Sequence, residues 1–211
     1  MFIKLTITNA SDLQRSVWAD AEQIWHDLRS VRGFLMQTGG WSQDFIGQAI
    51  FIEYWRDESS YAAFTHGEDE IAKRSTELFP EPTTLGGHVV NAVSISDIIS
   101  ILNEASFVRV SDCQLIPHFS PIFVAVQMEI WNQGLTQTPG MLGATWSRVE
   151  GSKDRFLATT FWRDKEAHDY YRREVFPGLE AKANPRKHLT SLTIHKAIVE
   201  PTWRFERIEQ T

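Results

Sequence analysis

The sequence predicts an α+β protein made of two tandem βαββαβ repeats, over residues 1–102 and 107–200, followed by a polar tail at residues 201–211. Two observations carry this prediction. The tripeptide Trp-Arg-Asp occurs at residues 55–57 and again at 162–164, and Gly33 and Gly140 each precede an apolar stretch. Both matches have the same offset of 107 residues (162 − 55 and 140 − 33). Collinear matches at one offset are typical of a duplicated unit.

The periodicity of apolar residues assigns the first elements of each repeat. Apolar and polar residues alternate over residues 2–8, and residues 107–111 resemble them position by position, which predicts a half-buried strand in each copy. Apolar residues at helical spacing over residues 17–28 predict the first helix, after the cap candidates at residues 9–12. Its counterpart in the second copy should start at Ser120, with Ser120 as the N-cap and proline at the first helical position.

The Trp-Arg-Asp tripeptides lie where a third strand should pass into a second helix. Asp57 and Asp164 are well placed to cap that helix, a contribution of about 0.5–2 kcal/mol. A final strand is expected at about residues 89–99 and 189–199, and residues 103–106 should form a short connector between the repeats.

Apolar residues occupy both faces of the third strand, over residues 50–55 and again over 156–162. One face must therefore be covered by the repeat's own helices and the other by a second apolar surface. The other copy is the natural candidate, so the two sheets are expected to lie face to face as a pseudo-dimeric α/β barrel. The alternative is that each copy pairs with another chain.

Composition excludes several classes of partner. The formal net charge is −6 with no basic run, which argues against binding to nucleic acid or to an anionic membrane surface. The third strand also lacks the basic-aromatic motif of RNA-recognition domains. No apolar run is long enough to cross a membrane, and no signal peptide is evident. Cys113 is the single cysteine and is expected to be a buried structural thiol, so we expect a cytoplasmic protein.

Candidate functional residues concentrate in the first copy. Its tryptophans can line an apolar ligand pocket, although they can equally fill a core. Glu53 lies on a central strand among apolar residues, where burial would suit a general base; the structural alternatives are pairing with a nearby arginine and turning out at a strand end. The seven histidines have no metal-binding spacing.

The duplicated pattern, with a glycine opening the second strand and a tryptophan ending the third just before an acidic cap, resembles the dimeric α/β-barrel superfamily in a tandem duplicated, ferredoxin-like form. Its members include antibiotic-biosynthesis-type and haem-degrading monooxygenases. The resemblance implies a small hydrophobic ligand between a sheet and its helices, and some members oxidise polycyclic substrates without metal or flavin. The haem-degrading branch implies roles for Asn9, Trp55 and His66. The second copy has Arg173 at the position equivalent to His66, with His168 as its nearest histidine.

These observations lead to a functional hypothesis, a cofactor-independent monooxygenase acting on a small hydrophobic or aromatic substrate. The alternatives are a ligand-binding or stress-associated protein on the same fold, and a haem-binding or haem-degrading enzyme. The chain is expected to be a monomer with an internal pseudo-dimer, a homodimer being the alternative. The expected catalytic residues are Trp55, His66, Asn9 and Glu53, and the expected substrate-binding residues are Trp25, His26, Trp41 and Phe51.

Overall fold

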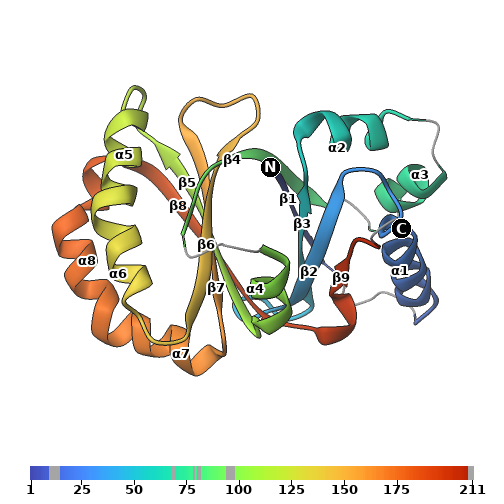
Figure 1. Cartoon of the computed structure of the whole chain (residues 1–211). Helices are drawn as coiled ribbons and strands as arrows, with labels where there is room; N and C mark the ends of the chain where they lie inside the picture. The colour runs from blue at the N-terminus through green and yellow to red at the C-terminus, as the bar shows by residue number, and fades with distance from the viewer. Residues whose placement is uncertain (10–14, 68–69, 78, 80–81, 94–97, 209–211) are drawn as a thin grey trace. The chain divides into compact units, whose positions relative to one another are not determined.

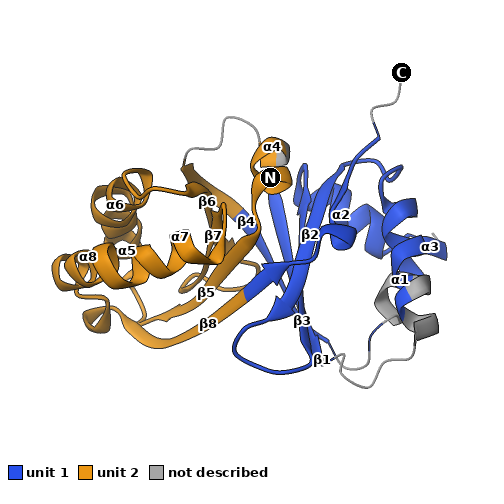
Figure 2. Cartoon of the chain, turned by 90° about the horizontal axis from the view of Figure 1, so that it is seen from below, with its two compact units in different colours: residues 1–88, 197–211 blue, residues 89–196 orange. Residues whose placement is uncertain are grey.

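The computed structural model describes residues 1–9, 15–67, 70–77, 79, 82–93 and 98–208. The chain divides into two compact units, coloured separately in Figure 2: unit 1 contains Met1–His88 and Ala197–Thr211, and unit 2 contains Val89–Lys196. Both boundaries fall inside strands, because β4 (Thr83–Val93) and β8 (Leu189–Val199) each begin in one unit and end in the other. The repeat limits expected from the sequence concern the duplicated segments and stay a prediction.

Unit 1 is a sheet with helices on one face (Figure 1). The central β3 pairs antiparallel with β1 and with β2, and β1 also pairs with the start of β4. The end of the chain returns to β2 through β9. The elements of this unit are β1 (Phe2–Asn9), α1 (Arg15–Leu28), β2 (Phe34–Ser42), β3 (Gln48–Trp55), α2 (Glu58–Thr65), α3 (Glu70–Glu77), the 3-10 turn η4 (Pro201–Trp203) and β9 (Phe205–Glu206).

Unit 2 repeats this order, with β7 pairing antiparallel to β5 and to β6. Two of its helical segments are interrupted by π-helical turns, η1 and η2. The elements are α4 (Ile98–Glu104), β5 (Phe107–Leu115), α5 (Ser120–Val126), η1 (Gln127–Trp131), α6 (Asn132–Thr136), β6 (Met141–Val149), β7 (Arg155–Trp162), α7 (Lys165–Tyr170), η2 (Tyr171–Val175), α8 (Phe176–Ala183) and the 3-10 turn η3 (Pro185–Lys187). The predicted α+β fold with two βαββαβ units is confirmed.

The two Trp-Arg-Asp corners have the same local structure. Asp57 caps α2 by accepting a hydrogen bond from the Ser60 amide at 2.7 Å, and Asp164 caps α7 in the same way at the Ala167 amide, also at 2.7 Å. Gly33 has a φ of +89°, which favours glycine, and a Cβ there would lie 2.3 Å from the Ser60 Cβ. Its carbonyl accepts a hydrogen bond from the Arg56 amide at 2.7 Å. The corner therefore ties the glycine, the third strand and the second helix together.

Three local predictions need correction. Residues 98–104 form the helix α4 rather than a strand end and a connector. Strand β4 starts at Thr83, well before residue 89, and ends at Val93. Ser120 is the first residue of α5 rather than its N-cap, because its hydroxyl donates to the Lys153 carbonyl at 2.6 Å instead of accepting from the helix. The cap candidates at residues 10–12 lie outside the described residues, whereas the predicted strand at 189–199 is confirmed.

An aromatic cluster fills the core of unit 1 between the sheet and the helices. Trp203, from the segment that the sequence marked as a polar tail, is 4% exposed and stacks on Trp18 with ring centroids 4.9 Å apart. The Phe51 ring lies 5.0 Å from Trp203 and the Trp25 ring 5.8 Å from it. The segment around Trp203 is therefore part of the hydrophobic core of unit 1.

Replacing this tryptophan tests the role of the C-terminal segment. Trp203→Ala should lower the free energy of unfolding by about 3–5 kcal/mol, because it leaves a cavity among rings that cannot close it. Urea denaturation measures the loss. Ile46→Ala is the matched control, since Ile46 is fully exposed and its change should stay within about 0.5 kcal/mol. A Trp203→Ala change as small as the control would show that the segment is not part of the core.

Candidate functional site

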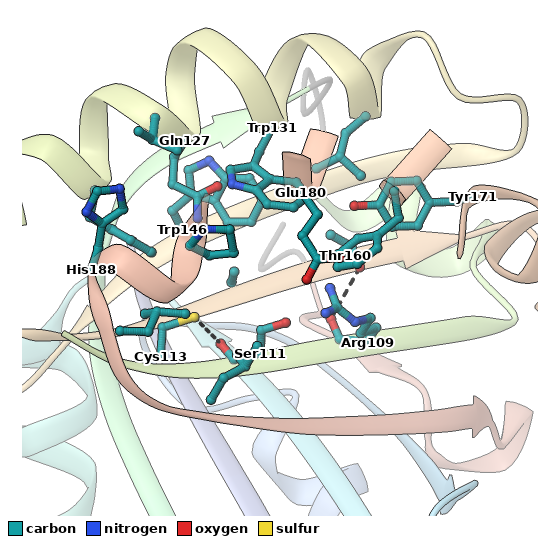
Figure 3. Close-up of a pocket in the computed structure, with 18 residues that line it drawn as sticks. Arg109, Ser111, Cys113, Gln127, Trp131, Trp146, Thr160, Tyr171, Glu180 and His188 are labelled. Carbon is teal, nitrogen blue, oxygen red and sulfur yellow. Dashed lines mark hydrogen bonds between the residues drawn. The ribbon is translucent and has the colours of Figure 1, made fainter. Parts of the chain in front are cut away.

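A cavity of about 90 Å³ lies within unit 2, between the strands β5, β6 and β7 and the helical segments above them (Figure 3). Both π-helical turns contribute to its wall, η1 with Gln127 and Trp131 and η2 with Tyr171. Such turns are frequent at functional sites. The aromatic and large apolar side chains of the wall include Phe123, Trp131, Leu135, Trp146, Tyr171 and Phe176. An apolar, aromatic-walled cavity of this kind suits a small hydrophobic ligand.

One pair of facing residues explains why unit 2 keeps this space open: the large and the small side chain occupy opposite strands in the two units. In unit 2, Trp146 on β6 lies opposite Ala158 on β7. At the equivalent positions of unit 1, Gly39 on β2 lies opposite Phe51 on β3. A Cβ on Gly39 would be 2.6 Å from the Ile50 carbonyl oxygen and 3.0 Å from the Phe51 ring. The large ring therefore stands on the central strand in unit 1, and on the neighbouring strand in unit 2.

Polar groups at the cavity have no hydrogen-bond partner within the described part of the chain. They are the Ser111 hydroxyl, the Gln127 side-chain oxygen and Nδ1 of His188. Ser111 is 4% exposed and Gln127 7% exposed, so neither group is well placed to reach bulk water. Unpaired buried polar groups are costly, and a ligand that bonds to them would remove that cost.

Within the described part of the chain, Arg109 is the only arginine or lysine that lines the cavity, and it is buried. It lies on β5 directly opposite Thr160 on β7. The Thr160 hydroxyl accepts from Nε1 of Trp162 at 2.9 Å and donates to the Arg109 carbonyl at 3.3 Å, so it does not engage the guanidinium. Among the described residues, no carboxylate lies within ion-pairing distance of Arg109. Burial lowers the pKa of this guanidinium below its usual value.

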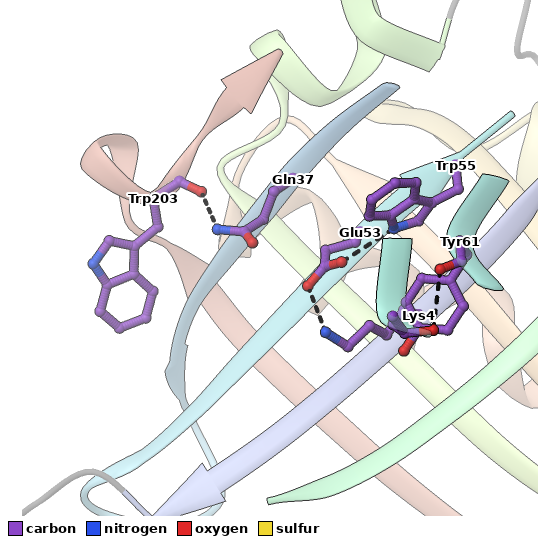
Figure 4. Close-up of polar contacts among 7 residues, drawn as sticks. Lys4, Gln37, Glu53, Trp55, Tyr61 and Trp203 are labelled. Carbon is purple, nitrogen blue, oxygen red and sulfur yellow. Dashed lines mark hydrogen bonds and ion pairs between the residues drawn. The ribbon is translucent and has the colours of Figure 1, made fainter. Parts of the chain in front are cut away.

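Unit 1 neutralises the equivalent position with an ion pair (Figure 4). Lys4 on β1 lies opposite Glu53 on β3, and Nζ is 2.9 Å from Oε1. Nε1 of Trp55 donates to the other oxygen of Glu53 at 3.1 Å. Burial acts to lower the pKa of Lys4, but the attraction of Glu53, together with Tyr61, outweighs it and raises the pKa. The Glu53 carboxylate is thus held by two partners, Lys4 and Trp55, and its basic partner is a lysine rather than the arginine suggested from the sequence.

The structure does not bring the other expected catalytic residues together. Asn9 pairs with Gln48 at one end of β1, and Trp55 pairs with Phe2 at the other end. Seven residue steps separate the two ends, roughly 24 Å in an antiparallel strand. His66 ends α2 at an exposed position, with Nδ1 3.0 Å from the Ala62 carbonyl oxygen. This separation does not fit one haem site built from Asn9, Trp55 and His66.

Three of the expected substrate-binding residues lie around Trp203. Their ring centroids, for Trp25, Trp41 and Phe51, are 5.8, 5.0 and 5.0 Å from its ring. Trp25 and Phe51 are buried in the core, whereas Trp41 is 37% exposed and packs at its edge. His26 lies apart, with 60% of its side chain exposed and Nδ1 3.9 Å from an Asp27 oxygen. Their assignment as site residues stays a prediction.

Cys113 and His168 show how the interior of unit 2 acts on ionisable groups. Burial raises the pKa of the Cys113 thiol to about 12, which keeps the sulfur protonated, as expected of a structural thiol. Burial and then the charge of Arg109 lower the pKa of His168 to about 4.

The described residues contain no cluster of three or more His, Cys, Asp or Glu side chains suited to a metal ion, and no described helix is long and apolar enough to span a membrane.

The buried ion pair in unit 1 makes a stability prediction. Glu53→Gln leaves Lys4, whose side chain is only 15% exposed, beside a neutral group, so the free energy of unfolding should fall by about 3–5 kcal/mol in urea denaturation. The double substitution Lys4→Met with Glu53→Gln should recover most of the loss. Lys165→Met removes an exposed pair with Asp169 and is the control, with little expected change. Equal effects for Glu53→Gln and the control would contradict this account.

His168 makes a prediction about pH. Its pKa is 6.5 in an unfolded chain and about 4 in the folded one, so between these values the unfolded chain binds the proton and the folded chain does not. Stability should therefore fall as the pH falls through this window, by about 2 kcal/mol at pH 4.5. His168→Phe keeps a ring among its aromatic neighbours and should remove this loss. Urea unfolding at pH 7 and pH 4.5 compares the two proteins, and an identical decrease in both would refute the assignment.

Comparisons with known proteins agree on the fold. The family model described as "Domain of unknown function (DUF4937)" matches residues 2–78. No curated protein sequence matches the chain. A solved structure of a proposed monooxygenase from Lactobacillus acidophilus has 13% identity and a TM-score of 0.71, covering 98% of this chain and 96% of that one.

Two further structures are similar over most of their length. A proposed monooxygenase from Fusobacterium nucleatum has 10% identity and a TM-score of 0.72, covering 94% of this chain and 91% of that one. An anthrone oxidase-like protein has 13% identity and a TM-score of 0.66, covering 94% and 91%. At these identities the likeness concerns the fold. The chain therefore has the duplicated ferredoxin-like fold of monooxygenase-like proteins, as the sequence resemblance predicted.

Proposed function

We propose that this chain is a monooxygenase-like protein that binds a small hydrophobic or aromatic compound in the cavity of unit 2 and oxidises it with dioxygen. The cavity itself carries the proposal. Unit 2 keeps an aromatic-walled space with unpaired polar groups, whereas aromatic rings including Phe51 and Trp203 fill the core of unit 1. The proposal moves the ligand from the first copy, where the sequence placed it, to the second.

The side chains present suit a substrate that supplies its own electrons. Oxidation of an activated CH₂ group to a carbonyl consumes one dioxygen molecule, places one oxygen atom in the product and releases the other as water. The protein then has to orient a flat ring, exclude bulk water and accept or return a proton. Aromatic walls serve the first two tasks, and Glu180 and His188 at the cavity are available for the third.

The relatives add an independent argument. Similar structures include two proposed monooxygenases and an anthrone oxidase-like protein, and an anthrone is an aromatic compound with an activated CH₂ group. A fold supports many functions, so this likeness supports the proposal only together with the cavity. Ligand binding without oxygen uptake would instead favour the ligand-binding alternative on the same fold.

The exchanged cross-strand pair provides the test. Ala158→Phe places the ring of unit 1 into the cavity of unit 2, so the dissociation constant for an aromatic ligand should rise at least tenfold and oxygen uptake with anthrone should fall accordingly. Thermal shift with an aromatic panel and an oxygen electrode measure the two effects.

Phe51→Ala is the matched control, because it removes the same ring at the equivalent position of unit 1. It should lower stability through a cavity in the core and leave ligand binding in unit 2 unchanged. The proposal fails if Ala158→Phe binds and oxidises as the unsubstituted protein does, or if only Phe51→Ala alters binding.

A further inference from the structure

We propose that Arg109 makes the cavity of unit 2 selective for aromatic compounds that carry one ionised oxygen group, a carboxylate or an acidic hydroxyl. This inference rests on the proposed function and adds the charge of the ligand and the group that recognises it. Because an acidic hydroxyl and a carboxylate both present an anionic oxygen, they share one mode of recognition.

The comparison of the two units supplies the main evidence. Lys4 and Arg109 occupy equivalent positions on the first strand of each repeat; Arg109 is buried, and Lys4 is mostly buried, with 15% of its side chain exposed. Lys4 has the Glu53 carboxylate opposite it, whereas Arg109 has Thr160. Burying a charge without a partner is expensive, so a protein keeps such a group only where something compensates it. An anionic ligand in the adjoining cavity would take the place that Glu53 has in unit 1.

The surroundings of Arg109 are suited to an anion. Ser111 lies two residues further along β5, on the same face of the strand, and its hydroxyl has no partner among the described residues. Figure 3 shows Arg109 and Ser111 below the helical segments that close the cavity. Arg172 does not line the cavity and is exposed, but its guanidinium lies 4.4 Å from the centre of the Phe176 ring, which is part of the wall. An anionic oxygen can therefore accept from Arg109 and Ser111 together.

Among the residues that the structure describes, Glu180 is the one carboxylate that lines the cavity, so it is the carboxylate to consider as an internal partner for Arg109. Its side chain lies on α8 at an exposed position, and the two groups are not within ion-pairing distance. Glu180 is hydrated and Arg109 is buried, so pairing them would require the carboxylate to lose water. The dissociation constant of an anion should therefore fall, or stay the same, in Glu180→Gln.

A pair of probes with the same shape and different charge tests the inference. 2-Naphthoate carries a carboxylate, and 2-naphthamide replaces it with a neutral amide of the same size. In the unsubstituted protein, naphthoate should bind at least tenfold more tightly than naphthamide, measured by calorimetry or by quenching of tryptophan fluorescence. In Arg109→Met the preference should disappear while naphthamide still binds.

Thr160→Glu is a second variant that does not remove Arg109. It recreates the pairing of unit 1, in which the carboxylate also accepts from the indole of the following tryptophan, so it should fold and should abolish the preference for naphthoate. Arg148→Gln is the matched control for net charge, because Arg148 is exposed and does not line the cavity. It should keep the full preference.

Each outcome separates the inference from the proposed function. Equal binding of the two probes to the unsubstituted protein overturns the role of Arg109 and leaves the aromatic cavity standing. Binding of neither probe, nor of any compound in the aromatic panel, overturns both. Arg109→Met should keep or raise the melting temperature, since it removes an unpaired buried charge. A large drop in melting temperature would instead assign Arg109 a structural role and contradict the inference.

Discussion

Each repeat carries a mostly or fully buried cation on its first strand, and among the described residues only unit 1 supplies a carboxylate to compensate it. In unit 1, Lys4 is neutralised by Glu53 across one pair of strands, and the indole of Trp55 holds the same carboxylate. In unit 2, Thr160 holds the equivalent indole of Trp162 but supplies no negative charge to Arg109. Both units thus keep the hydrogen bond from the indole to the central strand, but only unit 1 has a negative charge opposite its cation. This difference gives the cation of unit 1 a partner within the protein and leaves that of unit 2 for the anionic ligand that we propose.

The volume of the core follows the same division. The Gly39 and Phe51 pair places a large ring on the central strand of unit 1, where Trp203 packs against it. In unit 2, Trp146 lies opposite Ala158, so the central strand has only a small side chain beneath the helical segments, and the space there stays open. The π-helical turns η1 and η2 then direct Gln127 and Tyr171 to the same cavity. Duplication followed by specialisation of one copy accounts for both features.

The sequence predicts the architecture because its signals are local and repeated. The tripeptide corner, the capping role of Asp57 and the strand at residues 189–199 all depend on neighbours within a few residues, and the structure confirms them. The helix at residues 98–104 was missed, because its short apolar segment has no period that separates a helix from a strand.

The position of the cavity could not be predicted in the same way. It depends on which large ring faces which strand, and on Trp203 returning from the end of the chain to fill the core of unit 1. The tryptophans of the first copy favoured a pocket there, although buried tryptophans fill a core as readily as they line a pocket. One signal was present in the sequence: aligned repeats pair Lys4 with Arg109 and Glu53 with Thr160, a basic residue conserved between the copies beside a lost carboxylate.

A crystal structure of the chain grown with 2-naphthoate tests the central claim most directly. The account predicts one naphthoate per chain, within unit 2, with its carboxylate at charge-assisted hydrogen-bond distance, about 2.7–2.9 Å, from the Arg109 guanidinium. Naphthoate bound in unit 1, or bound in unit 2 with its carboxylate directed away from Arg109, would contradict the account.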